Sequence, residues 1–348
     1  MHSTEKKPTT DPAVYDLYLK GLHARGPQTR AALEEAIRCF EMAAKKDPKF
    51  SLAHSAWGNT YVLLGGTYMP FKEVYPRAKD LVNRAIELNP KSSEAHMARG
   101  NLAYQCELDW KKAEAELQEA ISLNPGNVEA HFWYGMVLLT VQRYDEAKEE
   151  LRETIRLNPM AGYPWTWLAV AELLSGDVFG ATGLAEELVA RDPASFLNRL
   201  VLAHCYVAEG RTADALKEAE KLAGPPEVGS RVGRAILFAV LGKPDEANRL
   251  VRELEERAKT AYVPLTWIAE LYAILEEKPK ALEMLERDFR EGDKGLWMEY
   301  QFPPFAAIRN EPRFVALLRG YKLPVVKEMP ALAPHAMETT KHPAGVPT

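Results

Sequence analysis

Small and bulky apolar residues recur in a fixed register along most of the chain, and prolines that follow Asn or Asp divide this pattern into units. These prolines are spaced 34 to 42 residues apart and are Pro48, Pro90, Pro125, Pro159 and Pro193. A proline ends a helix and forces the residue before it out of the α region. Each proline is therefore predicted to close a helical unit of about 34 residues, a period typical of repeat architectures.

The register within a unit indicates how its helices pack. We number each unit so that its closing proline is position 32. Position 8 is then small in five units, as Gly58, Gly100, Gly135, Ala169 and Ala203, and position 20 is alanine in eight, as Ala36, Ala78, Ala113, Ala147, Ala181, Ala215, Ala247 and Ala281. Small residues at both positions let two antiparallel helices cross closely, while bulky residues at positions 7, 11 and 24 fill the space on either side. Each pair leaves one apolar face uncovered, so neighbouring pairs must stack.

Residues 128–158 carry this register most completely, with Tyr134, Gly135, Leu138, Tyr144, Ala147 and Leu151 in its places. The pattern resembles the tetratricopeptide repeat over about residues 11–290. The resemblance implies an all-α fold, a right-handed α-solenoid superhelix of about eight helix-turn-helix repeats with a C-terminal capping helix. The second unit departs from the pattern because residues 65–71 are inserted between its two helices.

The two ends of the chain lack the repeat pattern. Residues 1–10 and the proline-rich residues 325–348 are expected to be flexible. Residues 291–324 are predicted to form one or two short capping helices, the last opening at Asn310-Glu311-Pro312. Such a terminal piece is needed because a stack of repeats must cover its last apolar face.

A narrower resemblance appears in residues 11–21, 107–114 and 310–318. These segments are similar to the repeat region that follows winged-helix DNA-binding, adenylate-cyclase or Ser/Thr-kinase domains in bacterial signalling proteins. That resemblance implies the sensing or partner-binding half of a regulator, with its effector domain missing or in trans. Only about ten residues precede the repeats, so we expect either a free-standing relative or a fragment.

Composition narrows the functional classes. Of 348 residues, 47% are hydrophobic, enough for a large folded core, and the net charge is −5, without the basic excess of a nucleic-acid-binding protein. Three widely separated cysteines exclude a disulfide framework and a CxxC zinc site. The sequence has neither an apolar stretch of about 18 residues nor an apolar signal segment. A cytoplasmic protein without membrane or nucleic-acid contacts is therefore expected.

The sequence carries no recognisable catalytic constellation. His54, His96 and His131 all occupy position 4, but equivalent positions of adjacent repeats lie on the order of 10 Å apart. Zinc needs its ligands at about 2 Å, so these histidines are expected to be half-buried packing residues. We predict no catalytic residue, metal or cofactor, and the protein is not expected to be an enzyme.

The resemblance to tetratricopeptide repeats implies that positions 2, 5, 9, 12 and 13 of each first helix line the concave groove. Residues expected there to bind a partner are Asn59, Asn101, Phe132, Met136, Leu139, Tyr163, Val170, Leu173, Leu200, His204, Val207 and Ile236. Family members that grip a C-terminal carboxylate use Lys, Asn and Arg in the groove. Here Asn59 matches, but Ser55, Ala98, Glu129 and Trp133 replace the others, so that clamp is absent.

The groove residues are mostly apolar and include no Lys or Arg, which favours a hydrophobic or amphipathic protein segment over RNA. The sequence therefore predicts a non-catalytic interaction scaffold or sensor module with a protein or peptide partner, and leaves self-association open. Two alternatives also stay open for the groove. Its residues pack on one another, or the carboxy-terminal tail, with Pro330 to Pro334, fills it as an internal ligand.

Overall fold

The structure is a computed structural model, which describes residues 11–222, 228–293, 295–301 and 303–325. Within these ranges the chain is helical and contains no β-strand, which confirms an all-α solenoid. An isolated bridge joins Gly65 to Met69. The expectations for residues 1–10 and for the tail, apart from Val325, concern residues outside the described ranges, and so does the idea of the tail as an internal ligand.

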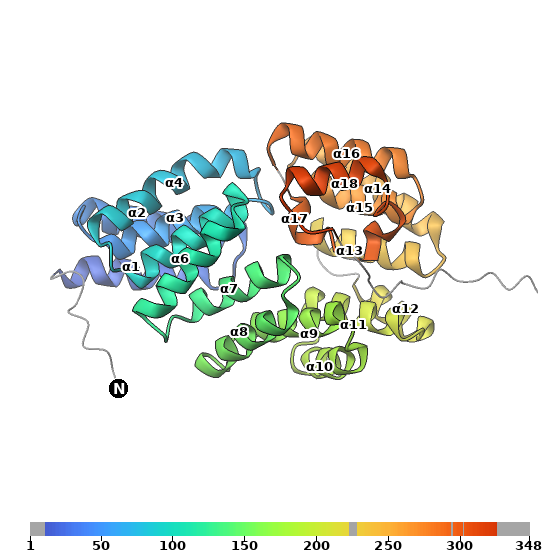
Figure 1. Cartoon of the computed structure of the whole chain (residues 1–348), viewed down its shortest axis with the longest axis horizontal. Coiled ribbons are helices and arrows are strands. Elements are labelled where there is room, and N and C mark those ends of the chain that lie inside the picture. The colour runs from blue at the N-terminus through green and yellow to red at the C-terminus, as the bar shows by residue number, and fades with distance from the viewer. Residues whose placement is uncertain (1–10, 223–227, 294, 302, 326–348) are drawn as a thin grey trace, which may run out of the picture.

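Helices α1 to α16 follow one another as antiparallel pairs (Figure 1). The first four pairs are α1 (Pro12–Arg25) with α2 (Arg30–Lys46), α3 (Ser51–Leu64) with α4 (Phe71–Leu88), α5 (Ser93–Leu102) with α6 (Trp110–Leu123), and α7 (Val128–Thr140) with α8 (Tyr144–Leu157). The others are α9 (Tyr163–Ser175) with α10 (Val178–Arg191), α11 (Phe196–Ala208) with α12 (Thr212–Lys221), α13 (Val228–Val240) with α14 (Pro244–Ala258), and α15 (Leu265–Ile274) with α16 (Lys278–Glu291). A π-helical turn, η1 (Ala103–Glu107), extends α5.

The Asn-Pro and Asp-Pro pairs end the helices where the sequence predicts. Helices α2, α4, α6, α8 and α10 all stop at the residue before the Asn or Asp. That Asn or Asp has an extended backbone, and in most units its side chain also accepts a hydrogen bond from the amide two residues later, as Asp47 Oδ1 does from Lys49 N at 3.0 Å. The side chain therefore supplies a turn that competes with the helix.

The small residues bring the two helices of a pair into close contact, as predicted. A Cβ added at Gly100 would lie 2.5 Å from Leu117 Cγ, and one added at Gly58 would lie 2.7 Å from Val82 Cγ2. The alanines at position 20 are fully buried at the same crossings. Positions 8, 20 and 24 therefore form one packing unit in each pair.

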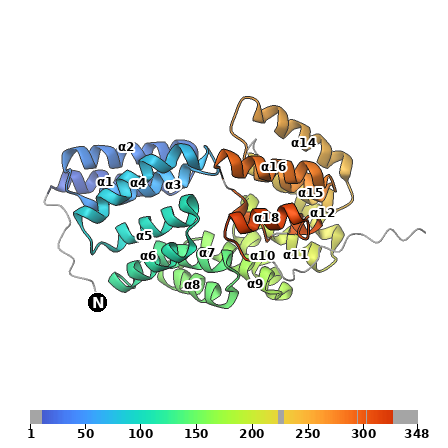
Figure 2. The ribbon, with the colours of Figure 1, turned by 45° about the horizontal axis from the view of Figure 1, so that its top comes forward.

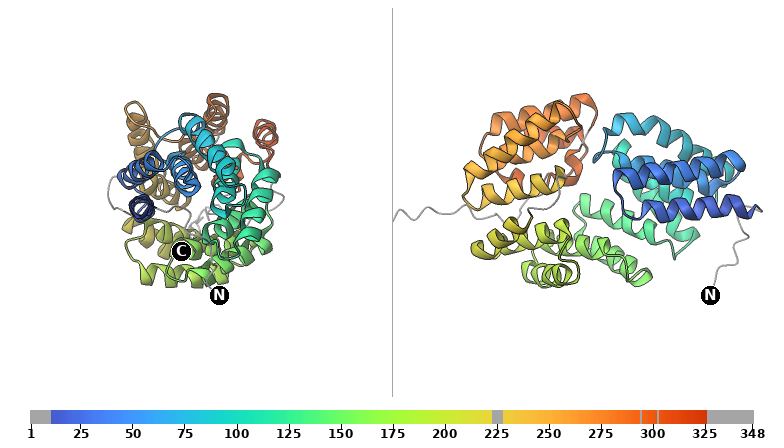
Figure 3. Two further views of the ribbon diagram at one scale, coloured as in Figure 1. Left: turned by 90° about the vertical axis from the view of Figure 1, so that its left-hand side faces the viewer. Right: turned by 180° about the vertical axis from the view of Figure 1, so that it is seen from behind.

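The carboxy-terminal helices fold back toward the amino-terminal half. They are α17 (Leu296–Glu299), the 3₁₀ turn η2 (Pro303–Ala307) and α18 (Pro312–Gly320). Views after a 45° turn, from the end and from behind show α16 and its neighbours returning to lie beside α3 and α4 (Figures 2 and 3). The sequence predicts that this segment caps the last repeat, and in the structure it also contacts the second, third and fourth pairs. No helix in the described part of the chain is long and apolar enough to cross a membrane.

Candidate functional site

The first helices of successive pairs line the inner surface of the solenoid, and most of the predicted groove residues are buried there. Eight of the twelve are buried: Asn59, Asn101, Phe132, Met136, Leu139, Val170, Leu173 and Ile236. The other four are half-buried and lie on α9 and α11: Tyr163, Leu200, His204 and Val207. Most of the predicted groove residues are therefore covered by the protein itself. The four half-buried residues form what we call the accessible face.

A chain of polar side chains links the first four helix pairs across the inner surface. Gln105 Nε2 donates to Asn101 Oδ1 at 2.6 Å, and Asn101 Nδ2 donates to Asn59 Oδ1 at 2.7 Å. Asn59 Nδ2 then donates to Glu129 Oε2 at 3.3 Å, while the other carboxylate oxygen of Glu129 is paired with Arg25. Each of these side-chain amides has a hydrogen-bond partner within the protein. This polar part of the inner surface therefore needs no ligand to complete its hydrogen bonds.

The described residues within 293–323, which we call the closing segment, contact η1, the start of α6 and the adjoining ends of α7 and α8. The ring of Trp297 lies 4.5 Å from that of Tyr104, centroid to centroid, and Trp297 is 1% exposed. Tyr300 Oη donates to the backbone oxygen of Thr140 at 2.6 Å, and Gln301 Nε2 donates to that of Leu139 at 3.0 Å. Both carbonyls belong to the last turn of α7. Leu139 O also accepts from Gln142 N at 3.1 Å, whereas Thr140 O has no backbone donor among the described residues. The closing segment therefore caps α7 and covers this part of the inner surface.

The accessible face lies beyond the closing segment, on α9 and α11. Tyr163 packs edge-on against Phe132 with ring centroids 4.6 Å apart, and Leu200 contacts the backbone of α13 at Gly233. His204 Nε2 is buried and has no hydrogen-bond partner among the described residues. Burial lowers the pKa of His204 to about 4, so its imidazole is neutral at pH 7. The face is therefore apolar with an uncharged polar edge.

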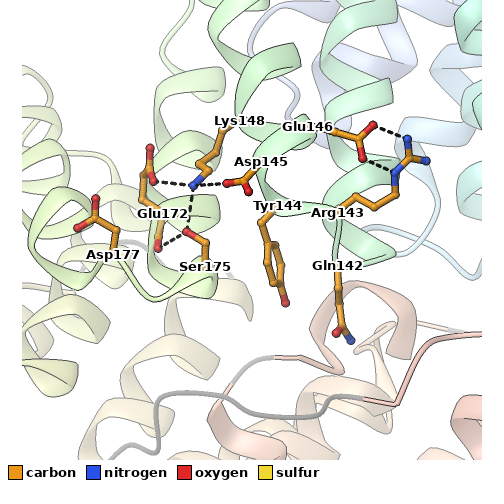
Figure 4. A pocket seen from close by; sticks show the side chains of 9 residues that line it. All are labelled: Gln142, Arg143, Tyr144, Asp145, Glu146, Lys148, Glu172, Ser175 and Asp177. Carbon is orange, nitrogen blue, oxygen red and sulfur yellow. Dashed lines mark hydrogen bonds and ion pairs between the residues drawn. The ribbon is translucent and has the colours of Figure 1, made fainter.

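A polar cleft of about 440 Å³ opens between the start of α8 and the α9–α10 turn (Figure 4). Lys148 Nζ lies 3.3 Å from Ser175 Oγ, a pair that catalyses acyl transfer when the amine is neutral. Lys148 also contacts Asp145 at 3.0 Å and Glu172 at 3.3 Å. Burial lowers the pKa of Lys148, but these two carboxylates raise it more, so the net shift is upward and the amine stays protonated at pH 7. Lys148 therefore cannot act as the base for Ser175 at this pH.

Comparison with known families agrees with this geometry. The family model described as "Tetratricopeptide repeat" matches residues 107–165, which span α6 to the start of α9. The chain contains tetratricopeptide repeats. Members of this family serve in general as scaffolds for protein interactions, because stacked repeats create extended concave surfaces. A comparison with curated protein sequences gave no match.

Solved structures resemble this tetratricopeptide-repeat protein in fold at low sequence identity. A tetratricopeptide repeat protein from Parabacteroides merdae is 16% identical, with a TM-score of 0.51 over 78% of this chain and 100% of that one. The human IFIT1 dimer with m7Gppp-AAAA is 16% identical, with a TM-score of 0.55 over 80% and 72%. PilW, a type IV pilus biogenesis factor, is 16% identical, with a TM-score of 0.50 over 70% and 100%. These similarities establish the fold alone.

The three position-4 histidines connect helices of the tetratricopeptide repeats. Each ring Nε2 contacts the backbone oxygen of the proline that closes the preceding unit, as His54–Pro48 (3.2 Å), His96–Pro90 (2.9 Å) and His131–Pro125 (3.1 Å). In the third and fourth units the ring Nδ1 also contacts a glutamate of the second helix, at 2.7 and 2.6 Å. No group of three or more His, Cys, Asp or Glu side chains that could hold a metal occurs in the described ranges.

Several residues of the inner surface were not among those predicted from the sequence. Arg25 lies on α1, whose unit is irregular, so the repeat register gives it no groove position. Trp297, Tyr300 and Gln301 lie outside the repeats altogether. For Arg25 the sequence offers one indication, its partner Glu129, an acid at a groove position where carboxylate-binding relatives have a lysine.

Proposed function

We propose that this tetratricopeptide-repeat protein is a non-catalytic scaffold that holds an apolar or amphipathic partner segment against the accessible face of α9 and α11. The observation that carries the proposal is the distribution of exposure along the inner surface. Predicted groove residues on α3, α5, α7 and α13 are buried within the chain, whereas Tyr163, Leu200, His204 and Val207 keep part of their surface open.

The chemistry of the accessible face favours a protein segment over a nucleic acid. Its four side chains are uncharged at pH 7, and His204 stays neutral because it is buried. Phosphate recognition requires basic side chains, and the arginine of the amino-terminal inner surface, Arg25, is already paired with Glu129. Half-exposed leucine and valine side chains gain about 1 kcal/mol each when a partner covers them.

Charged substitutions on the accessible face test this proposal. Leu200→Asp and Val207→Asp would each place a charge against an apolar partner, and we expect either to weaken binding at least about tenfold, or about 1.4 kcal/mol. Met42→Asp is the matched control, because Met42 is 45% exposed and lies on a second helix, α2, outside the inner surface. Circular dichroism of all three variants tests whether each keeps the helical fold.

The readout is affinity capture from the native cell followed by quantitative mass spectrometry. Proteins retained by the unmodified chain and by Met42→Asp, but lost with both Leu200→Asp and Val207→Asp, would support the accessible face as the binding site. If the two inner-surface variants stay folded and retain the same proteins as the control, partners bind elsewhere and the proposal is wrong.

A further inference from the structure

The first residue of the closing segment, Asp293, joins the carboxy-terminal helices to α4, so that the row of helix pairs closes into a ring. Asp293 Oδ1 accepts a hydrogen bond from the backbone amide of Phe71 at 3.0 Å, and its other oxygen accepts one from the hydroxyl of Tyr262. Phe71 is the first residue of α4, and 222 residues separate it from Asp293. The first amides of a helix lack internal partners and favour a negative charge. Asp293 therefore joins the eighth helix pair to the second.

A second buried carboxylate lies directly beside this closing contact. Asp288, in the last turn of α16, is fully buried, and its Oδ2 accepts hydrogen bonds from Gly295 N and Tyr321 Oη, both at 2.9 Å. Its Oδ1 is buried without a hydrogen-bond partner among the described residues. Asp293 N donates to the backbone oxygen of Asp288 at 3.2 Å across a turn at Gly292, whose φ is +79°. The two carboxylates therefore share one tight turn.

The charged groups around this turn do not neutralise both carboxylates. Lys72, next to Phe71, acts on Asp293, and Glu291 adds a further negative charge to the turn. Arg287 is paired with that glutamate at 2.6 Å, and Arg290 also acts on it.

The surroundings of Asp288 make its ionisation unfavourable. Burial is the main cause that raises the pKa of Asp288 to about 7, and the negative charge of Asp293 raises it further. The hydrogen bonds from Tyr321 and from the amide of Gly295 oppose this shift, and no basic side chain of the described residues is among its main influences. Burial also raises the pKa of Asp293, but the hydrogen bonds from Tyr262 and the Phe71 amide and the charge of Lys72 oppose that rise. Asp288, with the larger rise, is therefore the group of the pair that changes charge near neutrality.

We propose that Asp288 and Asp293 form a proton-controlled latch, in which protonated Asp288 lets the closing segment hold the ring shut, and ionised Asp288 favours release of that segment from α4. Ionisation places a second buried negative charge on the turn beside Asp293, and release exposes both carboxylates to water. It also uncovers the aromatic surface that Tyr104, Trp110 and Trp297 now share.

The direction of the pH effect follows from proton linkage. In the released state Asp288 would have the ordinary pKa of an aspartate, about 3.9, so the closed state holds one more proton between about pH 4 and 7. Closure is strongest at the acidic end of that window and weakens as the pH rises. The equilibrium constant for opening should increase about ninefold from pH 5 to 6 and about fivefold from pH 6 to 7, and it should level off above pH 7.

Hydrogen exchange at the Phe71 amide in the full chain measures this opening directly, after correction for the intrinsic pH dependence of exchange. The Ala130 amide is the matched control, because Asn127 caps it within its own repeat, at 3.0 Å. We expect Phe71 protection to fall about 50-fold from pH 5 to pH 7 while Ala130 protection stays constant. Equal pH profiles for the two amides, or a flat profile at Phe71, would overturn the latch.

Two variants assign the effect to Asp288. Asp288→Asn keeps both accepting contacts possible but does not ionise, so Phe71 protection should become independent of pH. Tyr321→Phe removes a hydrogen-bond donor that favours the ionised carboxylate of Asp288. Phe71 protection should therefore stop falling at a higher pH than in the unmodified chain. A Phe71 profile unchanged by either substitution would show that another group controls closure.

Discussion

The cap on helix α7 allows a quantitative test of the closing segment. Tyr300 is fully buried, and its hydroxyl donates to Thr140 O at 2.6 Å while it accepts from Gln142 Nε2 at 3.2 Å. Tyr300→Phe removes this hydroxyl and keeps the ring, so any loss of stability reports the polar contacts alone. The variant therefore separates the cap from the hydrophobic packing around it.

The expected magnitude follows from what each group loses. A buried hydrogen bond contributes about 1 kcal/mol, and a carbonyl left buried without a donor costs about 1–3 kcal/mol. Thr140 O is in the last turn of α7 and has no later amide to accept from, so it bears this cost. We therefore expect Tyr300→Phe to lower the free energy of unfolding by about 2 kcal/mol.

Urea denaturation followed by circular dichroism provides the assay. With an m value of about 3 kcal/mol/M, a loss of 2 kcal/mol lowers the midpoint by about 0.7 M. Tyr206→Phe is the control, because Tyr206 Oη donates to Glu186, an exposed side chain that water can solvate instead. If Tyr300→Phe shifts the midpoint no more than Tyr206→Phe does, the closing segment does not cap α7 in solution.

Three further predictions concern the repeats themselves. Gly100→Val should destabilise the protein by about 3 kcal/mol in the same denaturation assay, because a Cβ at this position has no room. Gly183→Ala, at an open helical position, should stabilise it by about 0.5–1 kcal/mol. Equal effects of the two substitutions would contradict the close helix crossing at Gly100. Arg25→Met should cost about 1–2 kcal/mol, and a double-mutant cycle with Glu129→Gln should recover about 1 kcal/mol as coupling; no coupling would refute the ion pair. The hydrogen bond that His96 Nδ1 donates to Glu116 on α6 raises the pKa of His96, so the stabilisation from this pair is complete below pH 6.5 and lost as the pH rises through the folded pKa. An NMR titration midpoint at or below 6.5 would contradict this.

The local pattern of the sequence determines the repeats because each signal acts within one unit. Asn-Pro and Asp-Pro pairs end helices through local backbone chemistry, and the size of position 8 sets how closely two neighbouring helices approach. These effects depend on residues a few turns apart, so Gly58, Gly100 and Gly135 could be assigned their packing role from the sequence alone.

The closure of the ring could not be predicted in the same way. Tyr300 and Gln301 bind backbone oxygens, which every residue has, so no pattern in the sequence identifies their partners. The repeat register likewise predicted which residues face inward, but burial depends on how far the superhelix curves and on what returns to cover it. Phe132 and Leu200 occupy groove positions of the same register, yet one is buried and the other half-exposed.

Cross-linking of the unmodified monomer with a lysine-reactive reagent tests most directly whether the chain closes on itself. Lys322 is exposed, and its backbone oxygen accepts a hydrogen bond from Trp110 Nε1 at 3.0 Å, which brings it beside Lys111 and Lys112 on α6. We predict intramolecular cross-links between Lys322 and these two lysines. Cross-links from Lys322 only to lysines of α16, such as Lys278 and Lys280, would show that the closing segment merely caps the last repeat.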